Sequence, residues 1–369
     1  MFSKRSIFVV PALAAALGVG SVSGQALNHK IDLPKDSPVT LLGTDFSNSV
    51  ATPRGGAYQV EVRAALSLRN SSGKKISGVV LAVYANEVTP GGKGSVSLPS
   101  LNVAPGDAFP VRIDLNLLRP LGGGPGAPVV EVKLDGVLFD DLTFYGPDTL
   151  HSQRAMRLWE LQARRDRQYY KSLLQTAGAN GLQNEMLALA AHVDPRKPGV
   201  QMVRGRATNL DADRMVQFAF LDFPGSPVEP LSGEASVGAN QARSPRMVIR
   251  NRSNRAVNHL EIGWLVKDSQ GREFLAASMG ADMKLAPNQS GEFTQDAALR
   301  FEQPVAIESM TGFVSSVEFA GGAYWIPSRG DLAEPRLRDT VAPSPEEQRL
   351  LQIYNKRGLD ALIEELKKF

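Results

Sequence analysis

The stretch LSLRNSSGKKISGVVLAVY, residues 66–84, occurs a second time in this chain as MVIRNRSNRAVNHLEIGWL, residues 247–265. The two copies align without a gap at a constant offset of 181 residues. Polar residues of the central turn recur: Arg69, Asn70 and Ser72 return as Arg250, Asn251 and Ser253. Apolar residues of the flanks recur as well: Leu68, Ile76, Val79 and Leu81 return as Ile249, Val257, Leu260 and Ile262. The chain therefore contains an internal duplication.

The second half of each copy alternates between two faces, as a half-buried β-strand does. Val79 and Leu81 fall on one face of the first copy, and Val80 falls on the other. The residue that matches Val80 in the second copy is Glu261. This charge predicts that the Val80 face is exposed to solvent. The Asn-rich segment before the strand is typical of a tight turn, because Asn and Ser side chains bond their own main chain.

The duplication continues downstream, where LDGVLFDDLTFYGP, residues 134–147, matches VSSVEFAGGAYWIP, residues 314–327, at an offset of 180. Apolar and aromatic positions are kept while polar ones differ. The recurring pairs are Val137 with Val317, Phe139 with Phe319, Tyr145 with Trp325, and Pro147 with Pro327. This pattern predicts two copies of one folded domain.

Short apolar segments separated by Gly and Pro turns fill each copy, and they favour an antiparallel β-sandwich. An immunoglobulin-like arrangement suits segments of this number and length, although the chain has no cysteine and therefore lacks the Cys…Trp…Cys signature. We predict a mainly β protein with two tandem antiparallel immunoglobulin-like β-sandwich domains, each followed by an amphipathic α-helix. The predicted segments are a signal peptide at 1–26, the first sandwich at 27–150, a helical connector with short strands at 151–224, the second sandwich at 225–330, and a polar linker with a C-terminal helix at 331–369.

Two helices are predicted from apolar periodicity. The first spans residues 151–174, and Gly178 and Gly181 end it. The second begins at Ser344 and is interrupted at Gly358. Because each carries large apolar side chains, we expect each to pack on a sandwich or on the other helix. Four residues of the second helix resemble four of the first: Leu350, Leu351, Ile353 and Tyr354 match Leu158, Trp159, Leu161 and Gln162.

The N-terminus has the pattern of a secretory signal peptide. Lys4 and Arg5 precede an apolar run over residues 7–19, and small residues lead to a predicted cleavage after Ala26. The alternative is an uncleaved membrane anchor, but the run is shorter than the roughly 20 residues that a span needs. We therefore expect an exported protein, periplasmic or extracellular, with no transmembrane segment after cleavage.

Charge and cysteine content exclude some classes of partner and of covalent modification. The chain has 41 basic and 38 acidic residues, and removal of residues 1–26 with Lys4 and Arg5 leaves 39 against 38. A nearly neutral mature chain does not suggest a nucleic-acid partner. The absence of cysteine excludes disulfides and a lipoprotein signal.

No known catalytic motif follows a strand or lies on a helix, so we assign no catalytic residue, metal site or cofactor. His192 and Asp194 come nearest to a metal pair, and Asp140 with Asp141 nearest to a calcium site, but turns explain both better. Three segments match the N-glycosylation pattern and are explained equally well by turn chemistry: they begin at Asn70, Asn251 and Asn288.

Six residues are candidates for partner binding. Four arginines of the first helix could contact an anionic partner, although a solvated helix face explains them too; they are Arg157, Arg164, Arg165 and Arg167. Tyr145 and Trp325 occupy equivalent positions and could stack on a sugar or peptide, although core packing explains them as well. We expect the basic side of the first helix to be outermost.

These observations favour an exported, non-enzymatic binding or scaffold protein of the cell envelope, with another envelope protein or a surface glycan as its partner. The alternatives are an exported hydrolase or an accessory subunit of one, and an envelope assembly factor that adds a partner strand to a sheet edge. A hydrolase would require two acids, or a histidine and an acid, to converge in space.

Overall fold

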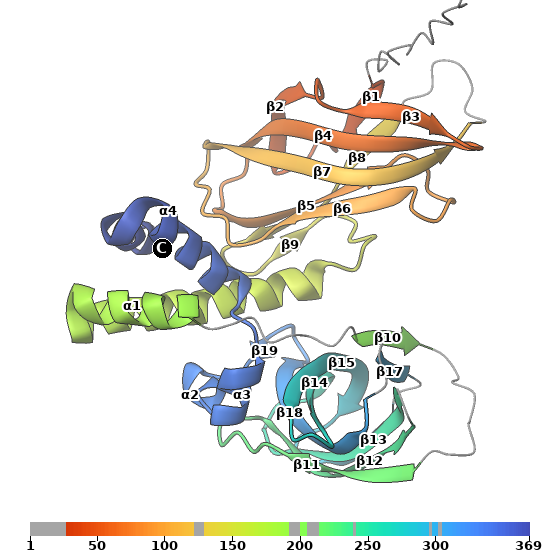
Figure 1. The fold of residues 1–369 in the computed structure, drawn as a ribbon. Helices are drawn as coiled ribbons and strands as arrows, with labels where there is room; N and C mark the ends of the chain where they lie inside the picture. Colours follow the sequence, from red (N-terminus) through yellow and green to blue (C-terminus); the bar gives the residue numbers. More distant parts are fainter. Residues whose placement is uncertain are drawn as a thin grey trace, which may run out of the picture. The chain divides into compact units, whose positions relative to one another are not determined.

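The computed structural model describes residues 27–121, 129–191, 200–204, 214–238, 241–294, 297–301 and 305–369. The predicted signal peptide and the pair His192 and Asp194 lie outside these residues. Contacts divide the chain into two compact units. The first comprises residues 1–69, 81–96 and 108–134, and the second comprises residues 70–80, 97–107 and 135–369. The described chain is mainly β, as the sequence predicts (Figure 1).

The strands before residue 150, called here the N-terminal β-region, form two sheets. One has the order β2-β4-β3 with β7 on β4, and the other has the order β1-β8-β5-β6 with β9 on β8. Their bounds are β1 His29–Asp32, β2 Val39–Asp45, β3 Val50–Arg54, β4 Ala57–Asn70, β5 Ile76–Tyr84, β6 Lys93–Leu98, β7 Ala108–Pro120, β8 Val130–Phe139 and β9 Phe144–Tyr145.

Buried and exposed residues alternate along strands β4 and β7. Leu66 lies opposite Val111, and Ala64 lies opposite Ile113. All four side chains are buried, while the residues between them on the same strands are exposed. Strands β4 and β7 are therefore half-buried, whereas the half-buried strand predicted at residues 79–84 is wrong, because β5 is buried on both faces.

The strands after residue 200, called here the C-terminal β-region, form one sheet with the order β10-β17-β13-β12-β11-β18-β14-β15, with β16 on β13 and β19 on β18. Their bounds are β10 Val200–Arg204, β11 Arg214–Phe220, β12 Val228–Val237, β13 Gln241–Asn251, β14 Val257–Asp268, β15 Glu273–Leu285, β16 Ser290–Thr294, β17 Ala297–Phe301, β18 Ile307–Phe319 and β19 Tyr324–Trp325.

One part of the fold prediction is wrong, because the sheets are not purely antiparallel. Strand β1 pairs with β8 in parallel, and β11 pairs with β18 in parallel. In each region a strand from the beginning meets a strand from the end, and the intervening chain makes the long connection that parallel pairing needs. Local alternation cannot reveal such pairing, because both orientations place side chains on alternate faces.

The duplicated turns have the same structure. Asn70 and Asn251 are both fully buried. The Asn70 amide donates to the carbonyls of Lys74 and Val103, and the Asn251 amide donates to those of Arg255 and Leu285. The hairpin ends match as well, since Val137 lies opposite Tyr145 and Val317 lies opposite Trp325. The predicted equivalent pairs are also buried: Leu68 with Ile249, Val79 with Leu260, and Phe139 with Phe319.

The predicted exposure of the Val80 face is wrong. Val80 is fully buried and packs with Leu138 and Met156. Met156 belongs to helix α1, Gln153–Ala191, which covers this face. Its counterpart Glu261 is half-buried and accepts a hydrogen bond from the Ser316 hydroxyl. The charge of Glu261 in the second copy therefore did not predict the burial of Val80 in the first.

Glycine changes the direction of both long helices. Gly178 in α1 and Gly358 in α4, Pro345–Lys367, have φ angles of 69° and 84°. The predicted breaks at these two positions are confirmed. The predicted break at Gly181 is wrong, because this residue has ordinary helical backbone. Two short helices, α2 Arg329–Leu332 and α3 Pro335–Thr340, occupy much of the predicted polar linker.

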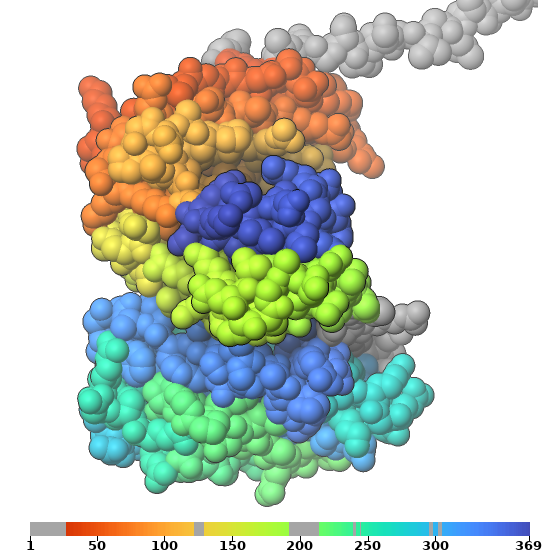
Figure 2. Space-filling model, turned by 90° about the vertical axis from the view of Figure 1, so that its left-hand side faces the viewer, coloured from red at the N-terminus to blue at the C-terminus, as the bar shows by residue number. Residues whose placement is uncertain are grey.

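The helices α1 and α4 lie side by side and share one apolar cluster (Figures 1 and 2). Its buried members are Tyr170, Leu182 and Met186 of α1 and Leu350, Leu362 and Leu366 of α4. These residues form three pairs at the offset of 180 that also separates Gly178 from Gly358. The earlier match of Leu350 with Leu158 is therefore wrong, and the duplication extends through the helices. The expected packing of one helix on the other is confirmed.

Candidate functional site: a basic pocket beside the paired helices

Buried carboxylates gather where α1 and α4 meet. Glu160 and Asp166 come from α1, and Glu346 and Glu347 come from the first turn of α4. Their side chains are at most 8% exposed, and arginines hold all of them. Burial of a carboxylate is costly unless a cation and hydrogen bonds accompany it. The arginine content of the first helix therefore has a structural cause in the acids that it neutralises.

Glu160 binds two arginines through one oxygen. Its Oε1 accepts from Arg164 Nε at 2.7 Å and from Arg167 Nη2 at 3.0 Å. The spacing of four and seven residues places all three side chains on one face of the helix. Arg167 Nη1 also reaches Glu346 Oε1 at 3.4 Å. The second oxygen of Glu160, Oε2, is buried and has no hydrogen-bond partner within the described residues.

Asp166 is the most enclosed of the four acids. Its Oδ1 accepts from Arg165 Nε at 2.9 Å, and its Oδ2 accepts from the Ser344 hydroxyl at 2.7 Å. Burial nevertheless raises the pKa of Asp166 above its ordinary value, with the Arg165 charge acting in the opposite direction. The neighbouring Tyr170 hydroxyl donates to Glu347 at 3.2 Å, and burial raises the pKa of Tyr170 as well. These groups fasten the two helices together.

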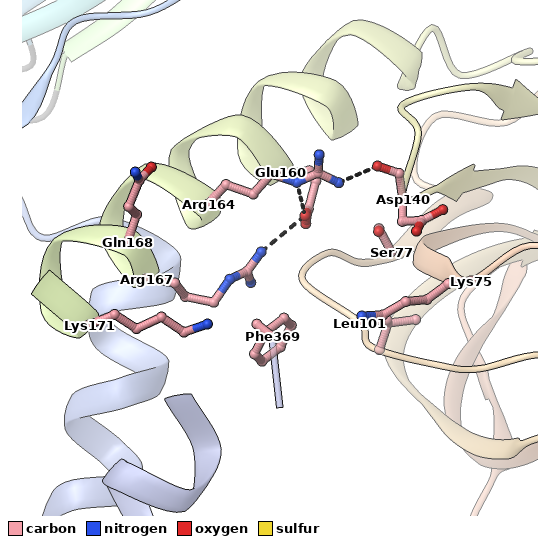
Figure 3. A pocket seen from close by; sticks show the side chains of 10 residues that line it. All are labelled: Lys75, Ser77, Leu101, Asp140, Glu160, Arg164, Arg167, Gln168, Lys171 and Phe369. Atoms are coloured by element: carbon pink, nitrogen blue, oxygen red, sulfur yellow. Dashed lines mark hydrogen bonds and ion pairs between the residues drawn. The ribbon is translucent and has the colours of Figure 1, made fainter. Parts of the chain in front are cut away.

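A cavity of about 370 Å³ opens beside this network (Figure 3). Its lining combines basic side chains with two acids, an amide and an aromatic ring: Lys75, Ser77, Leu101, Asp140, Glu160, Arg164, Arg167, Gln168, Lys171 and Phe369. All of them belong to the second compact unit. The turn before β5 supplies Lys75, and the loop after β8 supplies Asp140.

Phe369 lies among the cations of this pocket. The Arg167 guanidinium is 4.0 Å from the ring centroid, and Lys75 Nζ is 5.8 Å from it. Cations over an aromatic face are attracted by its quadrupole. Lys171 extends toward the ring from the opposite side to Lys75 in Figure 3. Among the described residues, the ion pairs at this pocket are made by Arg164 and Arg167 and not by either lysine.

The predicted partner-binding residues fall into separate places. Arg164 and Arg167 line the pocket. Arg157 donates to the Leu142 carbonyl at 3.0 Å, and Arg165 donates to the Pro327 carbonyl at 3.0 Å. The expectation that the basic side of this helix is outermost is wrong, since the Arg165 and Arg167 side chains are 16% and 5% exposed.

The two aromatic candidates lie outside the pocket. Tyr145 and Trp325 are half-buried on the short strands β9 and β19. Trp325 packs against the apolar core of the C-terminal β-region, in agreement with the core interpretation of this residue.

Sequence reasoning did not identify four of the residues that define the pocket. Glu160 and Lys171 belong to the predicted helix, but nothing in the helical pattern separated them from other charged positions. Lys75 and Phe369 are 294 positions apart, and only the tertiary fold brings them together.

A histidine and two acids meet elsewhere in the second unit. His259 Nδ1 is 2.7 Å from Asp282 Oδ1, which also accepts from Arg154 Nη2 at 3.1 Å. Arg154 Nε donates to Glu318 at 2.7 Å. The hydrogen bond with His259 is the main cause that lowers the pKa of Asp282. A histidine–acid pair of the kind that a hydrolase requires is therefore present on β14 and β15.

The described residues contain neither a cluster of metal ligands nor a helix able to span a membrane. No set of three or more His, Cys, Asp or Glu side chains there could hold a metal ion. No helix in the described ranges combines the length and apolar content needed to cross a bilayer.

Comparison with known proteins identifies no relative by sequence. No family model matches the chain. No curated protein matches it either.

Solved structures give only weak similarity. One match is a Northeast Structural Genomics Consortium target with 14% identity, which covers 32% of this chain and 83% of its own, at a TM-score of 0.17. Another is a β-glucosidase from Kluyveromyces marxianus with 8% identity, which covers 74% of this chain and 46% of its own, at a TM-score of 0.16. Scores this low support no conclusion about fold or activity.

Proposed function

We propose that this chain is an exported, non-enzymatic binding or scaffold protein of the cell envelope. It has two tandem immunoglobulin-like sandwich repeats, each with a helical extension. The paired extensions α1 and α4 provide a firm support for a binding site. The partner is another envelope protein or a surface glycan.

The observation that carries this proposal is the way the site distributes its charges. General acid–base catalysis needs a carboxylate that can exchange a proton with a substrate. The carboxylates that converge at the helices are instead buried and held by arginines, as Glu160 and Asp166 show. The cations Lys75 and Lys171 remain available to a ligand. A site of this composition is suited to holding a charged ligand rather than to cleaving it.

One observation favours the alternative, an exported hydrolase. The Asp282 side chain is 79% exposed and lies against His259, so a substrate could reach this pair. A carboxylate that orients a histidine is part of many hydrolytic sites. The binding proposal and the hydrolase alternative therefore rely on different residues, and variants can separate them.

The test is to incubate the mature protein with an insoluble fraction of envelope polymers. Retention of the protein in the pellet, without release of soluble fragments, supports the binding function. Release of fragments that is lost in His259→Ala and in Asp282→Asn would establish the hydrolase instead. Absence of both retention and release would contradict the proposed function.

Export has its own test. The intact chain is produced with its N-terminus, and the mass of the secreted or periplasmic form is measured. A mature form that begins at Leu27 is expected. A full-length form that stays with the membrane fraction would contradict the cleaved signal and support the anchor.

A further inference from the structure

We propose that the pocket beside α1 binds a hydroxylated carboxylate of the sugar-acid class, as a free molecule or as a residue of an acidic glycan. This inference rests on the proposed binding function and deepens it by naming the ligand chemistry. The acid group of the ligand lies between Lys75 and Lys171, and a hydroxyl of the ligand donates to Glu160.

The first argument is the balance of charge in the lining. Four basic side chains and two carboxylates line the cavity. Arg164 is bound to Glu160 and to the Asp140 carbonyl, and Arg167 is bound to Glu160. The two lysines are left as the groups that can pair with an anion. An ammonium group is a compact, mobile point charge, so two lysines can adjust to one carboxylate.

The second argument is the unpaired oxygen of Glu160. This side chain is 4% exposed, and its Oε2 has no partner among the described residues. A buried acceptor without a hydrogen-bond partner is unfavourable, because it has lost its bond to water. A ligand that can only accept hydrogen bonds, such as fully ionised sulfate, leaves this cost in place. A ligand with hydroxyl donors removes it, and the amide of Gln168 offers further pairing.

The third argument is size. A cavity of about 370 Å³ lies near the lower end of the range of roughly 300–1,000 Å³ that is usual for small-molecule sites. This volume accommodates a single sugar ring better than an extended peptide. Phe369 adds an apolar surface among the cations, and aromatic rings commonly contact the C–H faces of sugars.

The experiment is a calorimetric titration of the full mature chain with glucuronate, with glucose, and with a short oligogalacturonate. Glucuronate is expected to bind and glucose is not, since glucose has the hydroxyls but no acid group. Affinity for glucuronate should fall with rising salt, because the pairing is electrostatic. Equal binding of glucose, or no binding of either acid, would overturn the proposal.

Variants localise the binding. The double variant Lys75→Gln and Lys171→Gln should lose at least about tenfold in affinity for glucuronate, which corresponds to about 1.4 kcal/mol. The matched control is Lys356→Gln, at an exposed position of α4 away from the pocket. Unchanged affinity in the double variant would overturn the assignment of the site.

The oligogalacturonate arm distinguishes the two sources of the ligand. Tighter binding of the oligomer than of glucuronate indicates a glycan residue, and equal or weaker binding indicates a free sugar acid.

The outcomes also separate this inference from the proposed function. If wild type and double variant are retained equally on the envelope fraction, the binding function stands and the pocket assignment fails. If no form is retained there, the envelope function fails, whereas the titration with glucuronate still decides the pocket.

Discussion

Single polar residues hold the turns of this protein in place. Asn70 and Asn251 are fully buried, and each supplies the side-chain amide that pairs with carbonyls of its own turn and of a distant loop. The oxygen of each amide accepts from the hydroxyl of the serine two residues further along the chain, Ser72 or Ser253. An asparagine side chain has both a donor and an acceptor, so a single residue makes both sets of bonds.

Replacement of either asparagine should therefore destabilise the fold. We expect Asn70→Ala and Asn251→Ala each to lower the free energy of unfolding by roughly 1–3 kcal/mol, because buried carbonyls lose their donors. Urea denaturation measures this. The control is Asn288→Gly, since Asn288 is exposed with a φ of 58° that glycine adopts readily. Equal losses in all three variants would contradict the role of the buried amides.

Val80 tests which faces of β5 are covered. Because Val79 is 1% exposed and Val80 is 0% exposed, Val79→Asp and Val80→Asp should both destabilise by several kcal/mol. Thermal and chemical unfolding would measure the loss. A mild effect of Val80→Asp alone would show that α1 does not cover this face in solution.

At the scale of elements, two glycines shape both helical extensions. Gly178 and Gly358 combine positive φ with ψ near 180°, a region that is essentially restricted to glycine. Each lets the helix fold back so that Leu182 and Leu362 join the shared apolar cluster. Pro335 is the first residue of α3, and Pro345 is the first residue of α4, whereas the first copy has continuous helix over the matching residues.

Substitution at the two glycines should be costly. We expect Gly178→Ala and Gly358→Ala each to destabilise by roughly 1–3 kcal/mol, because alanine is strained at these angles. Gly73→Ala is the control, since a Cβ there meets nothing within 4 Å and its φ is not positive. If the denaturation curves of the three variants coincide, the need for glycine at positions 178 and 358 is contradicted.

The junction of α1 and α4 should respond to pH through Asp166. Burial raises its pKa in the folded state, so the folded protein holds the proton to higher pH than the unfolded chain does. The stabilising contribution is then complete below the ordinary aspartate pKa of about 4, and it is lost as pH rises through the raised value. Urea unfolding of the wild type and of Asp166→Asn is measured between acidic and neutral pH. The free energy of unfolding of the wild type should fall relative to that of the variant as pH rises. The opposite slope would mean that Arg165 outweighs burial.

On the scale of the whole molecule, α1 and α4 contact each other inside the second compact unit. Matched leucines at an offset of 180, Leu182 and Leu362, lie in the same cluster and are both fully buried. Most of the stability of a helix in a folded protein comes from packing of its apolar face, so α1 and α4 stabilise each other through this cluster.

Loss of a leucine from this cluster should weaken the packing of α1 against α4. We expect Leu182→Ala and Leu362→Ala each to destabilise by about 2–5 kcal/mol and to speed proteolysis within residues 153–177. Leu187→Ala is the matched control, because this leucine is 52% exposed and should change stability by less than about 0.5 kcal/mol. Rapid cleavage of the wild type within α1 would show that the helices do not hold one another.

Local sequence patterns predict the repeated segments, the breaks at Gly178 and Gly358, and the start of α4 after Ser344. These features depend on local backbone preference and on periodicity, which neighbouring residues express directly. Three features follow from contacts between distant segments: β1 and β8 run parallel, α1 buries Val80, and one pocket is lined by Lys75, Glu160, Lys171 and Phe369. The reason is that burial and charge pairing depend on which distant segment arrives at a surface. A single alternating strand or arginine-rich helix has the same sequence pattern whether water or another element covers its second face.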